Sequence, residues 1–198
     1  MATTISSGRA NSPKLTANIA DHGTIAGGRG LIFDGVTDYL DCSGNLENKI
    51  TTAWTISAWV KPADVTASHQ WIVAGSSSTN FGLRIYQDDV QATATATVGI
   101  STTIDITVSS VLSNDTWVHI VWTADLSDSK SYIYINGEQV GSDTSCAGSY
   151  SRTSNFIIGR RSASEYLDAT LSDVKIFDTA LTEAQVQELY LKPEQSAP

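Results

Sequence analysis

Apolar and polar residues alternate in several short stretches of the chain from residue 31 onward. In FGLRIYQ (81–87), Phe81, Leu83 and Ile85 fall on one face and the residues between them on the other. This period of two is typical of a β-strand with one buried face. Comparable apolar or alternating runs, which also predict strands, are WTISAWVK (54–61), QWIVAG (70–75), ATATATVGI (92–100), TWVHIVWTA (116–124), NFIIGR (155–160) and ATLSDVKIF (169–177).

Two local signals add a hairpin and a helix to these strands. In SYIYINGEQVG (131–141), Asn136 and Gly137 separate two strand patterns, and both residue types tolerate the positive φ of a type I′ turn. In LTEAQVQELYLKP, Thr182 and Gln185 form a capping-box pattern and Pro193 ends the helix. Many strands and one short C-terminal helix predict an all-β fold, an antiparallel two-sheet β-sandwich or jelly roll.

Residues 1–30 differ from the rest because they are polar and rich in Gly, Ser and Thr. We predict an irregular N-terminal arm over residues 1–30 and one domain over 31–198. Such an arm gains hydrogen bonds either by adding a strand to a neighbouring subunit, which we expect, or by packing on its own domain. No apolar run with a basic flank predicts a signal peptide, and no stretch is long enough to insert into a membrane.

Charge narrows the choice of partner. The chain has 12 basic and 21 acidic residues among 198, a formal net charge of −9. This balance argues against nucleic acid and anionic membrane surfaces, which require clustered Lys and Arg. It is compatible with divalent cations and neutral sugars. Cys42 and Cys146 leave two readings open, a disulfide or a pair of buried thiols.

Five sequence blocks, in order, resemble a known family. They are GLIFDGVTDYLD, WTISAWVKP, NDTWVHIVWTADLSDSKSYIYINGEQVG, NFIIGRR and ATLSDVKIFDTALTEAQVQELY. Together they resemble laminin G-like jelly-roll domains, which belong with the concanavalin A-like lectins and glucanases and with the pentraxins. The resemblance implies two stacked antiparallel sheets, one of them concave. It leaves function open, because this fold carries lectins, enzymes, adhesion modules and spacers.

The five blocks lack the carboxylate pattern that catalysis by this fold requires. Glucanases of this fold that resemble laminarinases carry an E-x-D-x-x-E run on one strand, and this chain has no such run. A retaining glycosidase needs two carboxyl groups roughly 5 Å apart, and the glutamates here are dispersed. His119 lies mid-strand, as a packed structural histidine would. We therefore assign no catalytic residue and keep a glycoside hydrolase only as a remote alternative.

Calcium is the metal that the resemblance suggests. The paired calcium site of pentraxins is not carried over, because Arg160 and Arg161 stand where its anionic ligands would be. A single structural Ca²⁺ remains possible, with ligands from Asp34, Asp38 and Asp173. The competing reading of LIFDGVTDYLD (31–41) is turn chemistry, in which an Asp side chain accepts hydrogen bonds from nearby backbone amides.

Sugar recognition by such folds uses aromatic side chains with polar groups beside them. The residues that we expect to bind a ligand are Trp71, Asn80, Tyr86, Arg161 and Tyr166. The sequence thus predicts a non-catalytic binding or surface module, for glycan recognition or adhesion. The alternative is a structural subunit of an assembly, such as a virion decoration or fibre protein, with protein subunits as partners. Either way we expect a homo-oligomer or assembly component at a virion or extracellular surface.

Overall fold

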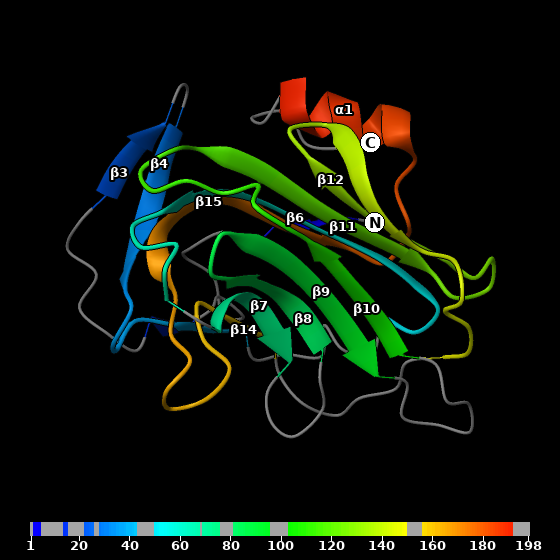
Figure 1. Cartoon of the computed structure of the whole chain (residues 1–198), viewed down its shortest axis with the longest axis horizontal. Coiled ribbons are helices and arrows are strands. Elements are labelled where there is room, and N and C mark those ends of the chain that lie inside the picture. The colour runs from blue at the N-terminus through cyan, green and yellow to red at the C-terminus, as the bar shows by residue number, and fades with distance from the viewer. Residues whose placement is uncertain are drawn as a thin grey trace.

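The computed structural model describes residues 2–4, 14–15, 22–25, 28–42, 50–67, 69–75, 81–95, 103–149 and 156–191. They form two antiparallel sheets and one helix (Figure 1). The first sheet has eight strands, in the order β13 (Glu138–Asp143), β12 (Lys130–Ile135), β11 (Val118–Asp125), β6 (Ala53–Pro62), β15 (Asp168–Phe177), β4 (Gly28–Asp34) and β3 (His22–Ile25), with β1 (Ala2–Thr4) also on β15. The second has seven, in the order β10 (Thr103–Val108), β9 (Asp89–Thr95), β8 (Phe81–Tyr86), β7 (Gln70–Gly75), β14 (Phe156–Ile158), β5 (Leu40–Cys42) and β2 (Lys14–Leu15).

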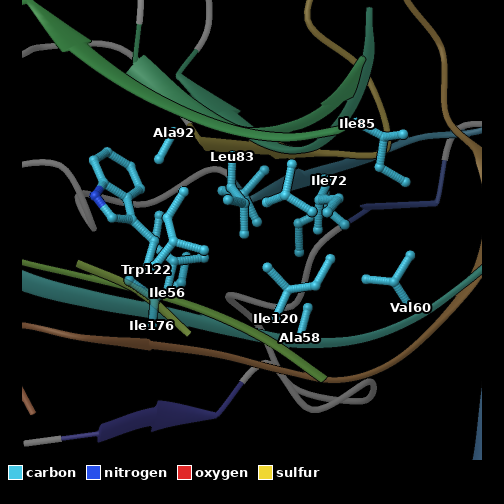
Figure 2. Packing of buried hydrophobic residues seen from close by; sticks show 14 of the residues in the cluster. Ile56, Ala58, Val60, Ile72, Leu83, Ile85, Ala92, Ile120, Trp122 and Ile176 are labelled. Carbon is cyan, nitrogen blue, oxygen red and sulfur yellow. The ribbon is translucent and has the colours of Figure 1, made fainter. Parts of the chain in front are cut away.

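The core lies between the two sheets, where the alternating apolar residues meet. Phe81, Leu83 and Ile85 of β8 are fully buried there, as the alternation predicts. Figure 2 shows Leu83 and Ile85 facing Ile120 and Trp122 of the first sheet. The predicted two-sheet jelly roll is confirmed. Both cysteines are buried as thiols, not joined in a disulfide.

The helix α1 (Glu183–Leu191) covers the outer face of the first sheet (Figure 1). Its N-terminus has the predicted capping box: the Gln185 side chain accepts a hydrogen bond from the Thr182 amide at 2.9 Å. Val186 and Leu189 of α1 pack with Val121 of β11 in a second small apolar cluster. The outer face of the second sheet carries no helix in the described part of the chain.

The turn between β12 and β13 is the predicted type I′ hairpin. Asn136 and Gly137 have φ values of 52° and 83°. The Asn136 side chain also accepts a hydrogen bond from the amide of His119 at 2.9 Å, which ties the turn to β11. A Cβ on Gly137 would lie 3.2 Å from the ring of Tyr190 in α1. The turn therefore needs glycine for its backbone and for its contact with the helix.

The described segments within residues 1–30 are short strands. β1 pairs with residues 175–177 of β15, on the side where β4 pairs with residues 168–171. β2 pairs with β5, and β3 forms a hairpin with β4. These described segments of the predicted arm are thus strands that pair within the same chain, and the division into an arm and a domain at residue 30 stays a prediction. Unpaired strand edges favour such additions, because they offer free backbone donors and acceptors.

Other differences from the sequence prediction are local. β10 is a strand that we did not predict. β9 spans residues 89–95, whereas the predicted strand covered residues 92–100. Residues 96–100 lie outside the described residues. No helix in the described ranges is long and apolar enough to cross a membrane.

Candidate functional site

The candidate site lies on the outer face of the second sheet, which is concave because its strands bow toward the core (Figure 2). With Leu83 and Ile85 pointing inward, the alternation in β8 turns Arg84 and Tyr86 outward. Gln91 of β9 is the register partner of Arg84 and shares this face. On the other side, the pairing of β7 with β8 shifts register between Trp71 and Val73. This bulge places Trp71 beside Arg84.

Trp71 is enclosed by its neighbours. The guanidinium carbon of Arg84 lies 5.2 Å from the centroid of the Trp71 ring, and that of Arg161 lies 4.9 Å from it. Gly82 supports the same indole, because a Cβ there would lie 2.8 Å from Trp71 Cζ3. The Trp71 side chain is 0% exposed. Two cations therefore cover the indole, and the role of Trp71 as a ligand-binding residue stays a prediction.

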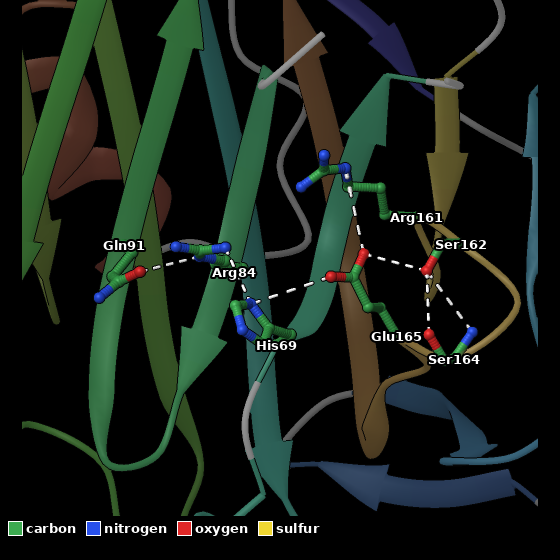
Figure 3. Close-up of polar contacts among 7 residues, drawn as sticks. All are labelled: His69, Arg84, Gln91, Arg161, Ser162, Ser164 and Glu165. Atoms are coloured by element: carbon green, nitrogen blue, oxygen red, sulfur yellow. Dashed lines mark hydrogen bonds and ion pairs between the residues drawn. The ribbon is translucent and has the colours of Figure 1, made fainter. Parts of the chain in front are cut away.

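A polar network joins these cations across the sheet (Figure 3). Arg84 donates from Nε to Gln91 Oε1 at 2.8 Å and from Nη1 to His69 Nδ1 at 3.0 Å. An arginine can only donate, so His69 Nδ1 accepts and carries no proton. The Nδ1 of His69 lies 3.9 Å from Glu165 Oε1. This contact is not an ion pair, because the imidazole that accepts from Arg84 is neutral.

Glu165 anchors the other end of the network. Its Oε2 accepts a hydrogen bond from the Ser162 hydroxyl at 3.1 Å and lies 4.0 Å from Arg161 Nε. The backbone also closes this segment, since the Arg161 amide donates to the Glu165 carbonyl at 3.3 Å. One short loop thus places a cation and a carboxylate against β7.

Tyr86 and His69 complete the group, which we call the Trp71 cluster: His69, Trp71, Arg84, Tyr86, Gln91, Arg161 and Glu165. The rings of His69 and Tyr86 meet edge to face, with centroids 5.0 Å apart. His69 has a φ of 62°, which is uncommon for a residue other than glycine. Strained backbone is often concentrated at functional sites. Burial and the neighbouring Arg161 lower the pKa of Arg84.

Tyr166 lies in an adjoining aromatic group. It forms an isolated β-bridge with Arg160, whose Nη1 donates to the Tyr166 hydroxyl at 3.1 Å. The guanidinium carbon of Arg160 lies 3.5 Å from the centroid of the Tyr39 ring. The rings of Tyr39 and Tyr166 are 6.5 Å apart. Tyr166 is partly exposed but is held by a partner within the chain.

The carboxylate of Asp34 is used in a turn. It accepts hydrogen bonds from the amides of Val36, Thr37 and Asp38 at 2.7–3.0 Å and from the Thr37 hydroxyl at 2.7 Å. Burial alone would raise the pKa of Asp34, but these hydrogen bonds outweigh burial and hold the pKa well below its usual range. LIFDGVTDYLD is thus a turn built around one aspartate.

The other two predicted calcium ligands do not complete a metal site with Asp34. Asp173 lies at a bulge of β15, where its carboxylate binds the Lys175 ammonium at 2.6 Å. The residue of β15 opposite Asp34 is Asp168, five positions earlier. Among the described residues, no group of three or more His, Cys, Asp or Glu could hold a metal ion. The calcium site therefore stays a prediction.

The structure brings together three of the five predicted ligand-binding residues, Trp71, Tyr86 and Arg161. Tyr166 is in the adjoining aromatic group, and Asn80 lies outside the described residues. Sequence reasoning missed His69, Arg84, Gln91 and Glu165. The outward position of Arg84 was already implied by the alternation in FGLRIYQ, whereas Glu165 depends on how the 161–165 loop closes.

Sequence comparison identifies the family. A family model described as the concanavalin A-like lectin/glucanases superfamily matches residues 34–187, which is more than half of the chain. The chain belongs to this superfamily. Members of it share the two-sheet fold described above, and the family includes both lectins and glucanases by name. No curated protein sequence matches the chain.

Solved structures show the same fold at low identity. Domain 4 of AbnA, an extracellular arabinanase from Geobacillus stearothermophilus solved with arabinotriose, is 18% identical over 90% of this chain and 88% of that domain, with a TM-score of 0.72. The binding domain of Paraclostridial Mosquitocidal Protein 1 is 15% identical over 91% of this chain and 48% of its own, with a TM-score of 0.72. The binding domain of botulinum neurotoxin DC, solved with SialylT, is 13% identical over 92% of this chain and 47% of its own, with a TM-score of 0.66. The chain thus spans about half the length of these toxin domains.

Proposed function

We propose that this domain is a non-catalytic glycan-binding module and that the outer face of the second sheet, centred on the Trp71 cluster, is its binding face. The observation that carries the proposal is the network in Figure 3, which gathers polar side chains from β8, β9, the 161–165 loop and His69, just before β7, on one sheet face. Arg84, Tyr86 and Gln91 are partly exposed there and can reach a ligand.

The chemistry of this face suits a sugar. Hydroxyl groups need donors and acceptors fixed in space, and Gln91, Arg84 and His69 hold one another in place. Sugar rings also present apolar C–H faces, for which the partly exposed Tyr86 ring is a platform. Similar folds support the proposal, because the arabinanase domain was solved with arabinotriose and the neurotoxin domain with SialylT.

Binding without catalysis is supported by the environment of the carboxylate. Glycoside hydrolysis requires a pair of carboxyl groups that flank the bond. Glu165 is the carboxylate of the Trp71 cluster, and it already contacts Arg161, His69 and Ser162. A glutamate held in this way serves to position its neighbours. The superfamily includes glucanases, so an activity assay on β-glucans belongs in the test.

The alternative, a structural subunit of an assembly, depended on an N-terminal arm that reaches a neighbour. β1, β2 and β3 pair with strands of the same chain, so no observation on this part of the molecule favours that reading over glycan binding. Oligomerisation and a place at a virion or extracellular surface stay predictions.

A glycan array that includes arabino-oligosaccharides and sialylated glycans tests the proposal. The best ligand is then titrated by calorimetry into the wild type, Tyr86→Ala and Gln91→Ala. The matched control is Tyr132→Ala, which removes a partly exposed tyrosine from the first sheet. We expect each site variant to weaken binding by about tenfold, which corresponds to ~1.4 kcal/mol, and the control to bind as the wild type does. Loss of affinity in the control alone, or no binding to any glycan, would refute the proposal.

A further inference from the structure

Two positive charges share one buried indole in the Trp71 cluster. The guanidinium carbons of Arg84 and Arg161 lie 5.2 and 4.9 Å from the same ring centroid. The two like charges repel each other, and the charge of Arg161 contributes to the lowered pKa of Arg84. Such a pair is unexpected in a chain with a formal net charge of −9. The arrangement is costly for the protein alone, which points to a function that needs both cations.

The chain compensates for these charges only in part. Glu165 is 4.0 Å from Arg161 Nε, and His69 is neutral because its Nδ1 accepts from Arg84. The negative charge of Asp105 also raises the pKa of Arg84, but Asp105 lies on β10, two strands away in the second sheet. Among the described residues within contact distance, Arg84 and Arg161 therefore carry two positive charges against the single negative charge of Glu165. One further negative charge would balance them.

Both arginines have N–H groups available to bind a further negatively charged group. Arg84 uses Nε for Gln91 and Nη1 for His69, and its Nη2 has no hydrogen bond to another described residue. Arg161 approaches Glu165 through Nε, and neither of its terminal nitrogens has a hydrogen bond within the described ranges. Its side chain is 24% exposed. The planar fork of arginine matches the two oxygens of a carboxylate.

We infer that the Trp71 cluster recognises a carboxylate-bearing sugar, a uronic or sialic acid residue, through Arg84 and Arg161. Trp71 and Gly82 support the two guanidinium groups from beneath, and Gln91, His69 and Glu165 fix their orientation. The acid group supplies the missing negative charge, while Tyr86 and Gln91 contact the rest of the sugar. This inference rests on the proposed function, since it specifies which glycans that face prefers.

Two matched pairs of probes test the inference. The first is an oligogalacturonate with free acid groups and the same oligomer with every acid methyl-esterified. The second is 3′-sialyllactose and lactose. Each pair differs in its carboxylate, and together they separate uronic from sialic acids. We expect the acid in at least one pair to bind about tenfold more tightly than its neutral partner, with affinity falling as salt is raised.

Single-residue variants then test which side chains cause the preference for the acid. Arg161→Gln should weaken binding of the acid more than binding of its neutral partner, so that the preference for the acid is lost. Arg161→Lys keeps the charge but loses the fork, so it should lose most of the preference. Lys130→Gln removes one exposed positive charge from the first sheet and should change nothing. Thermal melting confirms that each variant is folded.

The outcomes separate this inference from the proposed function. If glycans bind and Tyr86→Ala weakens them, but neither acid is preferred, the inference fails and the proposed function stands. A preference for the acid that survives in Arg161→Gln would also overturn the inference. If neutral and acidic glycans alike fail to bind, both fail together.

Discussion

His119 is expected to make the domain lose stability in mild acid. Its ring lies beside the stacked rings of Trp59 and Tyr190, with centroids 5.2 and 6.0 Å away, and is 1% exposed. The Nε2 of His119 is 2.9 Å from the Ser57 hydroxyl. Burial, with the nearby charge of Lys175, lowers the pKa of His119 to about 3 from its ordinary 6.5. The folded protein therefore holds this imidazole neutral.

The size of the effect follows from proton linkage. The unfolded chain binds a proton at His119 below pH 6.5, whereas the folded chain does not until the pH approaches 3. The stabilisation is thus complete above 6.5 and is lost as pH falls toward 3. Each pH unit in this window costs about 1.4 kcal/mol, so about 2 kcal/mol should be lost by about pH 5. The loss by pH 5 does not depend on the value of the His119 pKa in the folded protein, as long as that pKa lies well below 5.

The assay is urea unfolding of the wild type and His119→Phe between about pH 7.5 and pH 5. A phenyl ring can occupy the place of the imidazole beside Trp59 and Tyr190, but it leaves the Ser57 hydroxyl unpaired, which costs a constant ~1–2 kcal/mol. The other titrating groups are common to both proteins and cancel in the difference. The stability of the wild type relative to His119→Phe should therefore fall by about 2 kcal/mol between about pH 7.5 and pH 5, so that the variant becomes as stable as the wild type or more stable. Parallel pH curves would show that His119 is not held neutral by burial.

Three further substitutions test the fold around the site by urea unfolding. Gly137→Val places a β-branched residue at positive φ and against α1, so it should cost ~1–3 kcal/mol; a variant as stable as the wild type would contradict the turn type. Asp34→Ala should cost ~1 kcal/mol above about pH 4 and progressively less below it, because its depressed pKa stabilises the fold only while the carboxylate is charged. An unchanged difference in acid would refute that assignment. Gly82→Ala should cost ~1–3 kcal/mol, because its Cβ would lie 2.2 Å from the Val73 carbonyl oxygen and would press on Trp71; no loss would mean that the indole does not rest on this glycine.

Strand patterns were readable from the sequence because the core imposes them. The run at 70–75 coincides with β7, and the helix begins after Thr182 as its capping box predicts. β10 was missed, although it alternates Ile104, Ile106 and Val108 toward the core, because no strong turn signal precedes it. β1 and β2 could not be predicted, since a segment of two or three residues carries no periodicity and becomes a strand only when a sheet edge is available to pair with it.

The site was only partly predictable, for a different reason. Tyr86 and Arg161 were among the predicted ligand-binding residues, and alternation alone would have added Arg84. The burial of Trp71 could not be predicted, because it depends on a bulge in β7 and on cations from β8 and the 161–165 loop. Such contacts join segments far apart in the chain, and periodicity carries no information about them. The same limit applies to Asp34 and Asp173, whose carboxylates have partners in their own turn and bulge.

Amide chemical-shift mapping tests the central claim most directly, since it asks where on the molecule a glycan binds. The ¹⁵N-labelled domain is titrated with the best ligand from the array, and the shifted amides are assigned. We predict that the largest changes lie in β7, β8, β9 and the 161–165 loop, with the Arg84 and Arg161 guanidinium signals among them. Changes confined to α1 and the outer face of β11 and β12 would contradict the account, because they would place the binding face on the opposite sheet.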